Sequence, residues 1–205
     1  METTRRSRLR LADQTRLLAI ARRAIEAAVC PETDLAVDAS TLTAAMLKPA
    51  AAFVTLHERG ELRGCIGLLR FEVPLWLNVR DAARAAALED PRFMPVSRPE
   101  VQELDIEVSV LEPPVELGDA AGFEAGRHGI VVERGMRRAL LLPQVASEMG
   151  WGAEQMLDAV CRKAGLESGA WRDKRTRLFV FDSRCFGEDV GRRSPSHAAE
   201  VAAAP

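Results

Sequence analysis

The sequence lacks a charge excess of either sign. Its 205 residues carry 28 Lys and Arg against 30 Asp and Glu, so the formal net charge is −2. A surface that neutralises many phosphates normally requires a clear basic excess, and this balance therefore argues against a protein that coats nucleic acid. Hydrophobic residues make up 47% of the chain and charged residues 28%, which is typical of a globular protein with a substantial core.

Paired cysteines and long apolar runs are also missing. The four cysteines are widely spaced: Cys30, Cys65, Cys161 and Cys185. No two form a CxxC pair, so we expect no zinc or other metal site, and we expect no cofactor. No segment approaches the roughly 18 uncharged apolar residues that a membrane span needs. Arg22 and Arg23 interrupt the longest early apolar stretch, so we expect a cytoplasmic protein with reduced thiols.

The first half of the chain alternates helical and extended patterns. We expect residues 1–10 to form a flexible N-terminal segment. An amphipathic helix of roughly 16 residues is predicted from Asp13, its expected N-cap, to a stop before Pro31. Residues 53–67 are typical of two strands joined by a turn at Gly60. These are followed by a helix whose predicted bounds are Pro74 and Asp90–Pro91.

The second half adds more strands and two helices. The predicted strands are residues 103–111, 130–132, 138–142 and 178–181, and the predicted helices are residues 144–149 and 154–164. Strands that come in hairpins with helices between them indicate an α+β fold with a largely antiparallel sheet. We expect one two-lobed domain over residues 11–187, with a cleft between its lobes, and a disordered tail over residues 188–205.

Residues 62–67, with the sequence LRGCIG, are the local cluster that best suggests chemistry. In a strand, Arg63 and Cys65 lie on the same face, and a guanidinium beside a thiol favours the reactive thiolate. The flanking Gly64 and Gly67 would leave room for a substrate to approach. A buried structural cysteine, with glycines that serve a bulge, explains the same residues without function.

A nucleophilic cysteine also needs a base. His57 lies on the partner strand, where a histidine at a strand end is commonly exposed. His128 precedes Gly129 in a loop that enters a strand, which is a better position for an acid or base.

Three further residues are weaker candidates. Asp105 and Glu107 share the polar face of one predicted strand, where they would act as acid, base or ligand, or simply face solvent. The segment from Asp90 to Phe93 is typical of a turn that ends a helix, and its exposed Arg92 is a further candidate for binding.

Several separated motifs resemble the AMMECR-type domain family. The resemblance rests on residues 60–67 (GELRGCIG), 90–93 (DPRF), 104–111 (LDIEVSVL), 126–130 (GRHGI) and 141–146 (LLPQVA). It continues through Gly150–Trp151 and residues 163–166, and covers about residues 11–187. Arg127 stands where the family often has Lys, and Gly152 stands where Asp is usual, which leaves the next helix without that N-cap.

The resemblance implies a two-lobed α+β protein with a cleft near Arg63–Gly67. It also implies that this chain is the A component of the AmmeMemoRadiSam system, beside a Memo-like protein and a radical SAM protein.

Three hypotheses for function stay open. In the first, Cys65 is a covalent nucleophile for a small molecule or peptide, Arg63 lowers its pKa or holds an anion, and His128 is the acid or base with Glu107. In the second, the chain is a non-catalytic adaptor whose glycine-lined groove receives a ligand or partner. In the third, it binds or modifies RNA through the basic residues around Arg134–Arg138.

Overall fold

The computed structural model describes residues 9–30, 32 and 36–188. These residues form two compact units. Unit 1 comprises the described residues up to Val110 together with residues 184–188, and unit 2 comprises Leu111–Ser183. The predicted flexible segment over residues 1–10 and the predicted tail over residues 188–205 lie almost entirely outside the described residues.

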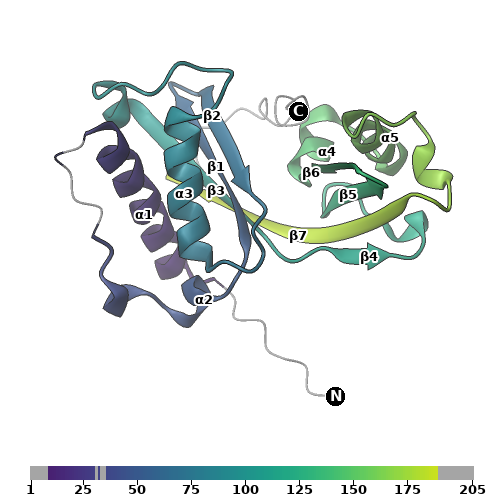
Figure 1. Ribbon diagram of the computed structural model, residues 1–205, viewed down its shortest axis with the longest axis horizontal. Coiled ribbons are helices and arrows are strands. Elements are labelled where there is room, and N and C mark those ends of the chain that lie inside the picture. The colour runs from purple at the N-terminus through teal and green to yellow at the C-terminus, as the bar shows by residue number, and fades with distance from the viewer. Residues whose placement is uncertain (1–8, 31, 33–35, 189–205) are drawn as a thin grey trace. The chain divides into compact units, whose positions relative to one another are not determined.

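Unit 1 packs helices on one face of a sheet. Its elements are α1 (Leu11–Val29), α2 (Ala44–Leu47), β1 (Ala51–Glu58), β2 (Glu61–Leu68), α3 (Leu75–Leu88), β3 (Leu104–Leu111) and the end of β7 (Arg177–Gly187). Helices α1 and α3 lie side by side against β1 and its neighbours (Figure 1). The alanines Ala82, Ala83 and Ala86 are buried in α3, and their small side chains let the helix approach the sheet closely.

The first helix begins earlier than its pattern predicts. Its N-cap is Arg10, and Asp13 occupies the third helical position, where its carboxylate accepts the Arg10 backbone N–H at 2.8 Å. The prediction of Asp13 as N-cap is therefore wrong, because an acidic side chain inside the first turn satisfies a free N–H equally well.

The predicted hairpin of β1 and β2 is confirmed, with a turn at Arg59 and Gly60 in the left-handed region (φ 53° and 88°). One expectation on this hairpin is wrong. His57, which the pattern predicts at an exposed strand end, is only 4% exposed, and it follows an irregularity in the register at Leu56/His57. There Leu56 pairs with Gly64 and His57 with Leu62, so Arg63 is the extra residue of β2, and such an irregularity breaks the simple alternation of faces.

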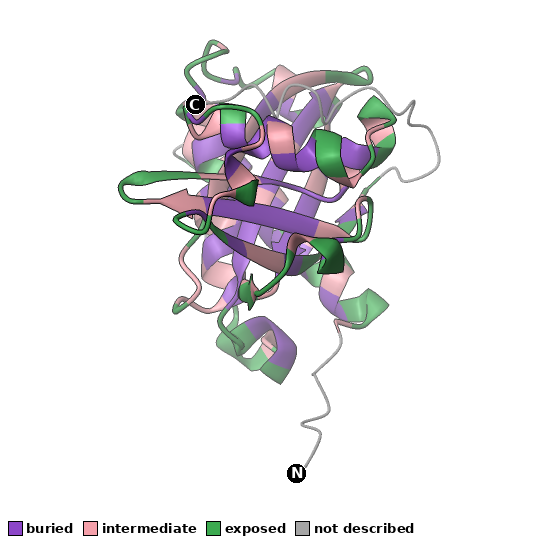
Figure 2. Cartoon of the chain, turned by 90° about the vertical axis from the view of Figure 1, so that its right-hand side faces the viewer, coloured by how far each residue is buried: buried purple, intermediate pink, exposed green. Residues whose placement is uncertain are grey.

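Unit 2 builds a second core around a smaller group of strands. Its elements are β4 (Val115–Leu117), β5 (His128–Arg134), β6 (Arg137–Leu141), α4 (Gln144–Met149), α5 (Ala153–Lys163) and most of β7. Helix α5 buries Met156, Leu157 and Val160 in this core. Its N-cap is Gly152, whose backbone N–H is accepted by the Gln155 side chain at 2.7 Å. Buried residues follow the strands and the inner helix faces, and exposed ones gather at turns (Figure 2).

The described strands form one sheet in the order β2-β1-β3-β7-β5-β6, with β4 also paired to β7. The α+β class with a largely antiparallel sheet is confirmed, since the hairpins and the pairs of β7 with β4 and β5 are all antiparallel. Strand β7 is 11 residues long, much longer than the predicted strand over residues 178–181. Among the described residues, no helix is long and apolar enough to cross a membrane.

Candidate functional site

Cys65 lies on β2, the strand at the end of the sheet in unit 1. It is half-buried, and its Sγ lies 3.2 Å from the Oγ1 of Thr55, its cross-strand partner on β1. An end strand has one row of backbone groups with no neighbouring strand to bond. The surroundings of Cys65 therefore depend on what covers this edge of β2.

Asp90 and Arg92 cover the edge of β2 at Cys65. The Asp90 carboxylate accepts the Cys65 backbone N–H at 2.8 Å, and the Arg92 guanidinium donates to the Cys65 carbonyl oxygen at 3.4 Å. The two side chains are themselves bonded, Nε to Oδ1 at 3.0 Å and Nη2 to Oδ2 at 2.8 Å. Only 2% of the Asp90 side chain is exposed. This ion pair therefore takes the place of a neighbouring strand, a role the sequence analysis missed.

Arg63 is engaged elsewhere. Its Nε donates to Glu100 at 2.8 Å and its Nη1 donates to the Met94 carbonyl oxygen at 2.9 Å. The guanidiniums of Arg63 and Arg92 both lie near the Phe93 ring, at 6.0 and 5.4 Å from its centroid. Arg63 thus anchors the segment after α3 to β2, and its binding role stays a prediction.

The thiol of Cys65 is less acidic than the sequence suggested. Burial raises its pKa, which outweighs the lowering effects of the Thr55 hydroxyl and the Arg92 charge. Asp90 and Glu107 raise the pKa further by charge repulsion. The expectation that the pKa of Cys65 lies below its ordinary value is therefore wrong, because desolvation dominates. The cation among the main contributions to this pKa is Arg92.

Gly64 and Gly67 do not leave open space beside Cys65. A Cβ on Gly64 would lie 2.3 Å from the Ala86 carbonyl oxygen of α3, and a Cβ on Gly67 would lie 2.2 Å from the Phe53 ring. Gly64 is needed for close packing of the helix on the sheet, and Phe53 covers Gly67 from the partner strand. The expectation that these two glycines leave room for a substrate is therefore wrong.

Glu107 lies on β3 and is half-buried. It is close enough to Cys65 for its charge to raise the pKa of the thiol. Asp105 acts in the same way on Arg22, whose pKa it helps to raise. Glu107 is thus the predicted acid or base that unit 1 brings within electrostatic reach of the thiol.

His128 begins β5 in unit 2, whereas Cys65 belongs to unit 1. Its Nδ1 accepts the Glu124 backbone N–H at 3.2 Å, and its ring lies 6.4 Å from that of Phe123. These contacts fix the ring at the entrance to the strand, and the Nδ1 bond leaves the proton on Nε2 when the ring is neutral. A role beside Cys65 stays a prediction.

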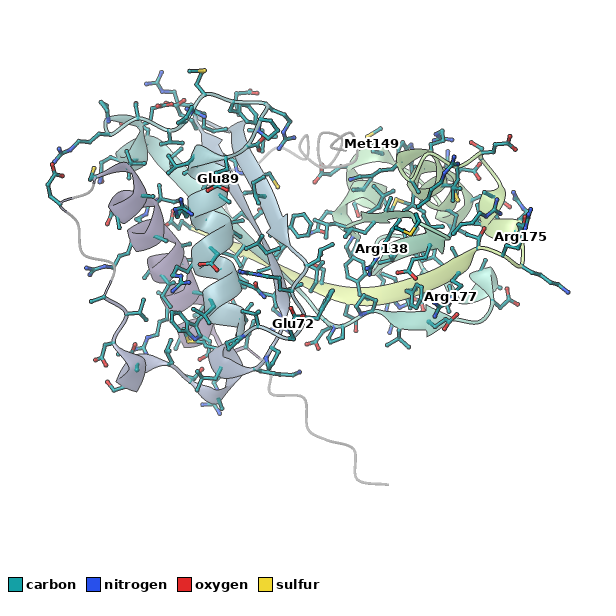
Figure 3. The ribbon with its side chains drawn as sticks, in the orientation of Figure 1. Glu72, Glu89, Arg138, Met149, Arg175 and Arg177 are labelled. Carbon is teal, nitrogen blue, oxygen red and sulfur yellow. The ribbon has the colours of Figure 1, made fainter. Side chains whose placement is uncertain are left out.

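The basic residues behind the RNA hypothesis already have partners. Arg134 donates to Thr176 at 2.8 Å and pairs with Asp173 at 3.0 Å. Arg137 donates to the Gly165 carbonyl oxygen, and Arg138, labelled in Figure 3, pairs with Glu133 at 3.1 Å. Paired guanidiniums offer less charge to phosphates, so this cluster gives the RNA hypothesis little support.

The remaining cysteines differ from Cys65 in their surroundings. Cys161 is buried in the core of unit 2, where burial raises its pKa, whereas Cys185 is exposed and Cys30 is half-buried. Across the part of the chain that the structure describes, no group of three or more His, Cys, Asp and Glu side chains is arranged to hold a metal ion.

A pocket of about 490 Å³ in unit 2 was not predicted. Its walls come from residues 116–120, 171–174 and 176–178. Three acidic and three basic side chains line it: Glu116, Asp119, Asp173, Arg172, Lys174 and Arg177. Arg177, labelled in Figure 3, pairs with Glu116 at 2.9 Å. The balanced charges favour no class of ligand. The sequence did not predict this pocket, because its walls come from two segments far apart in the chain and neither contains a recognisable motif.

Comparison with known proteins identifies the family. The AMMECR1 family model matches residues 18–186. A protein of Methanothermobacter thermautotrophicus is 46% identical over 143 residues, which are 67% of this chain and 74% of that protein. Protein TK0174 of Thermococcus kodakarensis is 38% identical over 189 residues, 86% of this chain and 90% of that one.

A solved structure agrees with these sequence matches. The crystal structure of the uncharacterized protein PH0010 from Pyrococcus horikoshii is similar at a TM-score of 0.77 and 35% identity, over 87% of this chain and 92% of that chain. The resemblance seen in the motifs is thereby confirmed. This chain belongs to the AMMECR1 family.

Proposed function

We propose that this chain acts on a small molecule or peptide by covalent catalysis at Cys65. One observation carries the proposal: the Asp90–Arg92 pair bonds both the N–H and the C=O of Cys65, while its sulfur contacts the Thr55 hydroxyl. A reactive group needs neighbours that hold it in a fixed geometry. The contacts with Asp90, Arg92 and Thr55 supply that support here.

Because burial raises the pKa of Cys65, the resting thiol is protonated near neutral pH. The nucleophile must then form during the reaction, and Glu107 is the base in this proposal. As the sulfur attacks an electrophilic carbonyl carbon, its proton passes to the Glu107 carboxylate and a C–S bond forms. The leaving group departs with its electron pair and takes up that proton. Water then hydrolyses the thioester and restores the thiol.

The test uses p-nitrophenyl acetate as an acyl donor for the purified full chain. We expect acetylation at Cys65 with release of p-nitrophenol, and steady turnover that Cys65→Ala and Glu107→Gln abolish. Cys30→Ala is the matched control and retains turnover. Acetylation confined to the exposed Cys185, with Cys65→Ala unchanged, would sink the proposal.

The variant Glu107→Gln distinguishes a general base from a charge that only changes the pKa of Cys65. Removing the Glu107 charge lowers the pKa of Cys65, because that charge raises it. Iodoacetamide, which needs only the thiolate, should therefore alkylate Cys65 faster in Glu107→Gln at neutral pH, while ester turnover falls. A parallel rise in both rates contradicts Glu107 as the base.

A non-catalytic binding module is the second candidate. The raised pKa of Cys65 and the filled space at Gly64 and Gly67 favour it, since a protonated thiol on a packed strand is suited to structure. Under this alternative, Cys65→Ser preserves the function of the protein in its host. Under the catalytic proposal, Cys65→Ser loses that function.

From the family resemblance we propose that the protein works in the cytoplasm alongside a Memo-like protein and a radical SAM protein. A reducing compartment would keep the Cys65 thiol free. The test is gel filtration of the full chain with each purified partner from the same organism. A shift of the chain to a larger species supports the assembly, and independent elution from both partners contradicts it.

A further inference from the structure

We propose that Arg92, anchored by Asp90, is the positioning residue that prepares Cys65 for reaction, in place of Arg63. This inference rests on the proposed function of Cys65, because it names the residues that hold and tune that thiol. Arg92 acts on Cys65 through its backbone and through its charge. It is not itself a reacting group.

The backbone contacts place Arg92 at Cys65 specifically. Its Nη2 reaches both the Cys65 carbonyl oxygen at 3.4 Å and the Asp90 Oδ2 at 2.8 Å, and that same Oδ2 accepts the Cys65 N–H at 2.8 Å. The three groups form a closed ring of hydrogen bonds on the open edge of β2. A residue held at both its N–H and its C=O has little freedom to move its backbone, and this fixes the point from which its side chain projects.

The anchor itself is rigid. Asp90 accepts bonds from the Arg92 backbone N–H at 3.1 Å and from the Arg92 side chain, and it is almost wholly buried. Burial works to raise the pKa of Asp90, but the bonds from Arg92 and Cys65 outweigh it and hold that pKa below its ordinary value. Asp90 therefore remains a carboxylate and fixes the Arg92 guanidinium in one orientation.

The groups that act on the thiol come from three segments of the chain. Arg92 and Asp90 lie after α3, Glu107 lies on β3, and the neutral Thr55 hydroxyl lies on β1. Of the charged groups, Asp90 and Glu107 disfavour the thiolate and Arg92 favours it. Loss of the Arg92 charge would remove the cation that favours the thiolate and keep both carboxylates that disfavour it.

Arg63 occupies a different environment although it lies two residues away. Glu100 balances its charge at 2.8 Å and the Met94 carbonyl oxygen takes a second N–H. The sequence places only Arg63 near Cys65, and the structure brings Arg92 to it from 27 residues away. Arg63→Gln is therefore the natural comparison for Arg92→Gln.

The test measures the pH profile of alkylation at Cys65 by iodoacetamide in the folded full chain, with each cysteine peptide quantified by mass spectrometry. We expect Arg92→Gln to shift the profile to higher pH, because the Arg92 charge lowers the pKa of Cys65. Arg92→Lys keeps the charge and restores most of the wild-type profile. Arg63→Gln and the surface control Arg84→Gln leave the profile unmoved, and the exposed Cys185 serves as internal reference.

Two results would overturn the inference: an unchanged profile in Arg92→Gln, or a larger shift in Arg63→Gln. If Arg92→Gln does not fold, Arg92→Met keeps more of the aliphatic stem and is compared with Arg92→Lys. Arg92→Met shifts the profile to higher pH and Arg92→Lys does not, because only lysine retains the charge; identical profiles overturn the inference.

The ester assay separates this inference from the proposed function. Wild-type turnover with an unmoved Arg92→Gln profile removes only the role of Arg92. A moved profile in a protein that never turns over p-nitrophenyl acetate removes the catalytic role of Cys65 and leaves the coupling of Arg92 to the thiol intact.

Discussion

The carboxylate of Asp90 accepts the backbone N–H of Cys65 at 2.8 Å, across 25 residues of sequence. Through this bond, a turn that ends α3 closes the open edge of β2. The DPRF segment therefore supports the backbone of Cys65, the residue on which the proposed function depends. The contacts of Cys65 and its neighbours lead to four predictions about stability.

Asp90→Asn should lower the free energy of unfolding by about 1–3 kcal/mol, because it removes the charge of a buried carboxylate that accepts hydrogen bonds from Arg92 and from the Cys65 N–H. The neighbouring Glu89, labelled in Figure 3, pairs with Arg84 on the surface. Glu89→Gln should cost less than about 1 kcal/mol. Urea unfolding of both variants measures these losses. Equal losses of unfolding free energy would show that the contacts of Asp90 contribute no more than a surface ion pair.

Gly64→Ala should destabilise the protein by about 1–3 kcal/mol, since the new methyl group would lie 2.3 Å from the backbone oxygen of Ala86. Helix α3 would have to move away from β2. Gly118→Ala is the matched control, because a Cβ there meets nothing within 4 Å. Thermal unfolding should leave Gly118→Ala within about 0.5 kcal/mol of wild type. A neutral Gly64→Ala contradicts the close approach of helix and strand.

Gly67→Ala should be costly only while Phe53 is present. The Phe53 ring covers Gly67, and a Cβ would come within 2.2 Å of it. In the Phe53→Ala background the same substitution should cost at least about 1 kcal/mol less, which a double-mutant cycle of unfolding free energies measures. Gly129 and Phe181 form a second pair of this kind in unit 2 and should behave alike. Additive costs in both cycles would refute the contact.

Glu100→Gln should lower the free energy of unfolding near neutral pH and have little effect in acid. Hydrogen bonds from Arg63 and then Ser97 lower the pKa of Glu100 from 4.5 to about 2. A depressed folded-state pKa adds stability above the unfolded pKa, and this contribution disappears as the pH falls from about 4.5 to about 2. The two proteins should therefore differ by on the order of 1 kcal/mol above about pH 5 and converge toward pH 2.

Urea titrations of both proteins at a series of pH values between these limits provide the measurement. A difference of constant size at every pH would mean that the Glu100 carboxylate does not gain its stability from ionisation. Wild-type protein at high salt is a useful second comparison, since a partly exposed pair is weakened by screening.

Local patterns were sufficient for most elements. The alternation of Leu104, Ile106, Val108 and Val110 predicts β3, and all four side chains are buried. The turn at Gly60 and the helix that follows Pro74 were also predicted, because positive φ and the missing proline N–H act over a few residues. Strand β4 and most of β7 were missed, because their pairing partners lie far away in sequence and their own residues show no alternation.

The sequence by itself determined the α+β class, the hairpins and the family, since each of these depends on periodicity, turn residues or ordered motifs. It also pointed to Cys65 and Arg63 as neighbours and, separately, to Arg92 as a candidate for binding. Only the tertiary structure decided what each neighbour does. Arg63 bonds to Glu100, and Arg92 bonds to Asp90 and Cys65. Ala86 packs against Gly64, and Phe53 packs against Gly67. The charge, burial and free space at a thiol are set by chain segments that pack against it, and a local pattern contains no record of them.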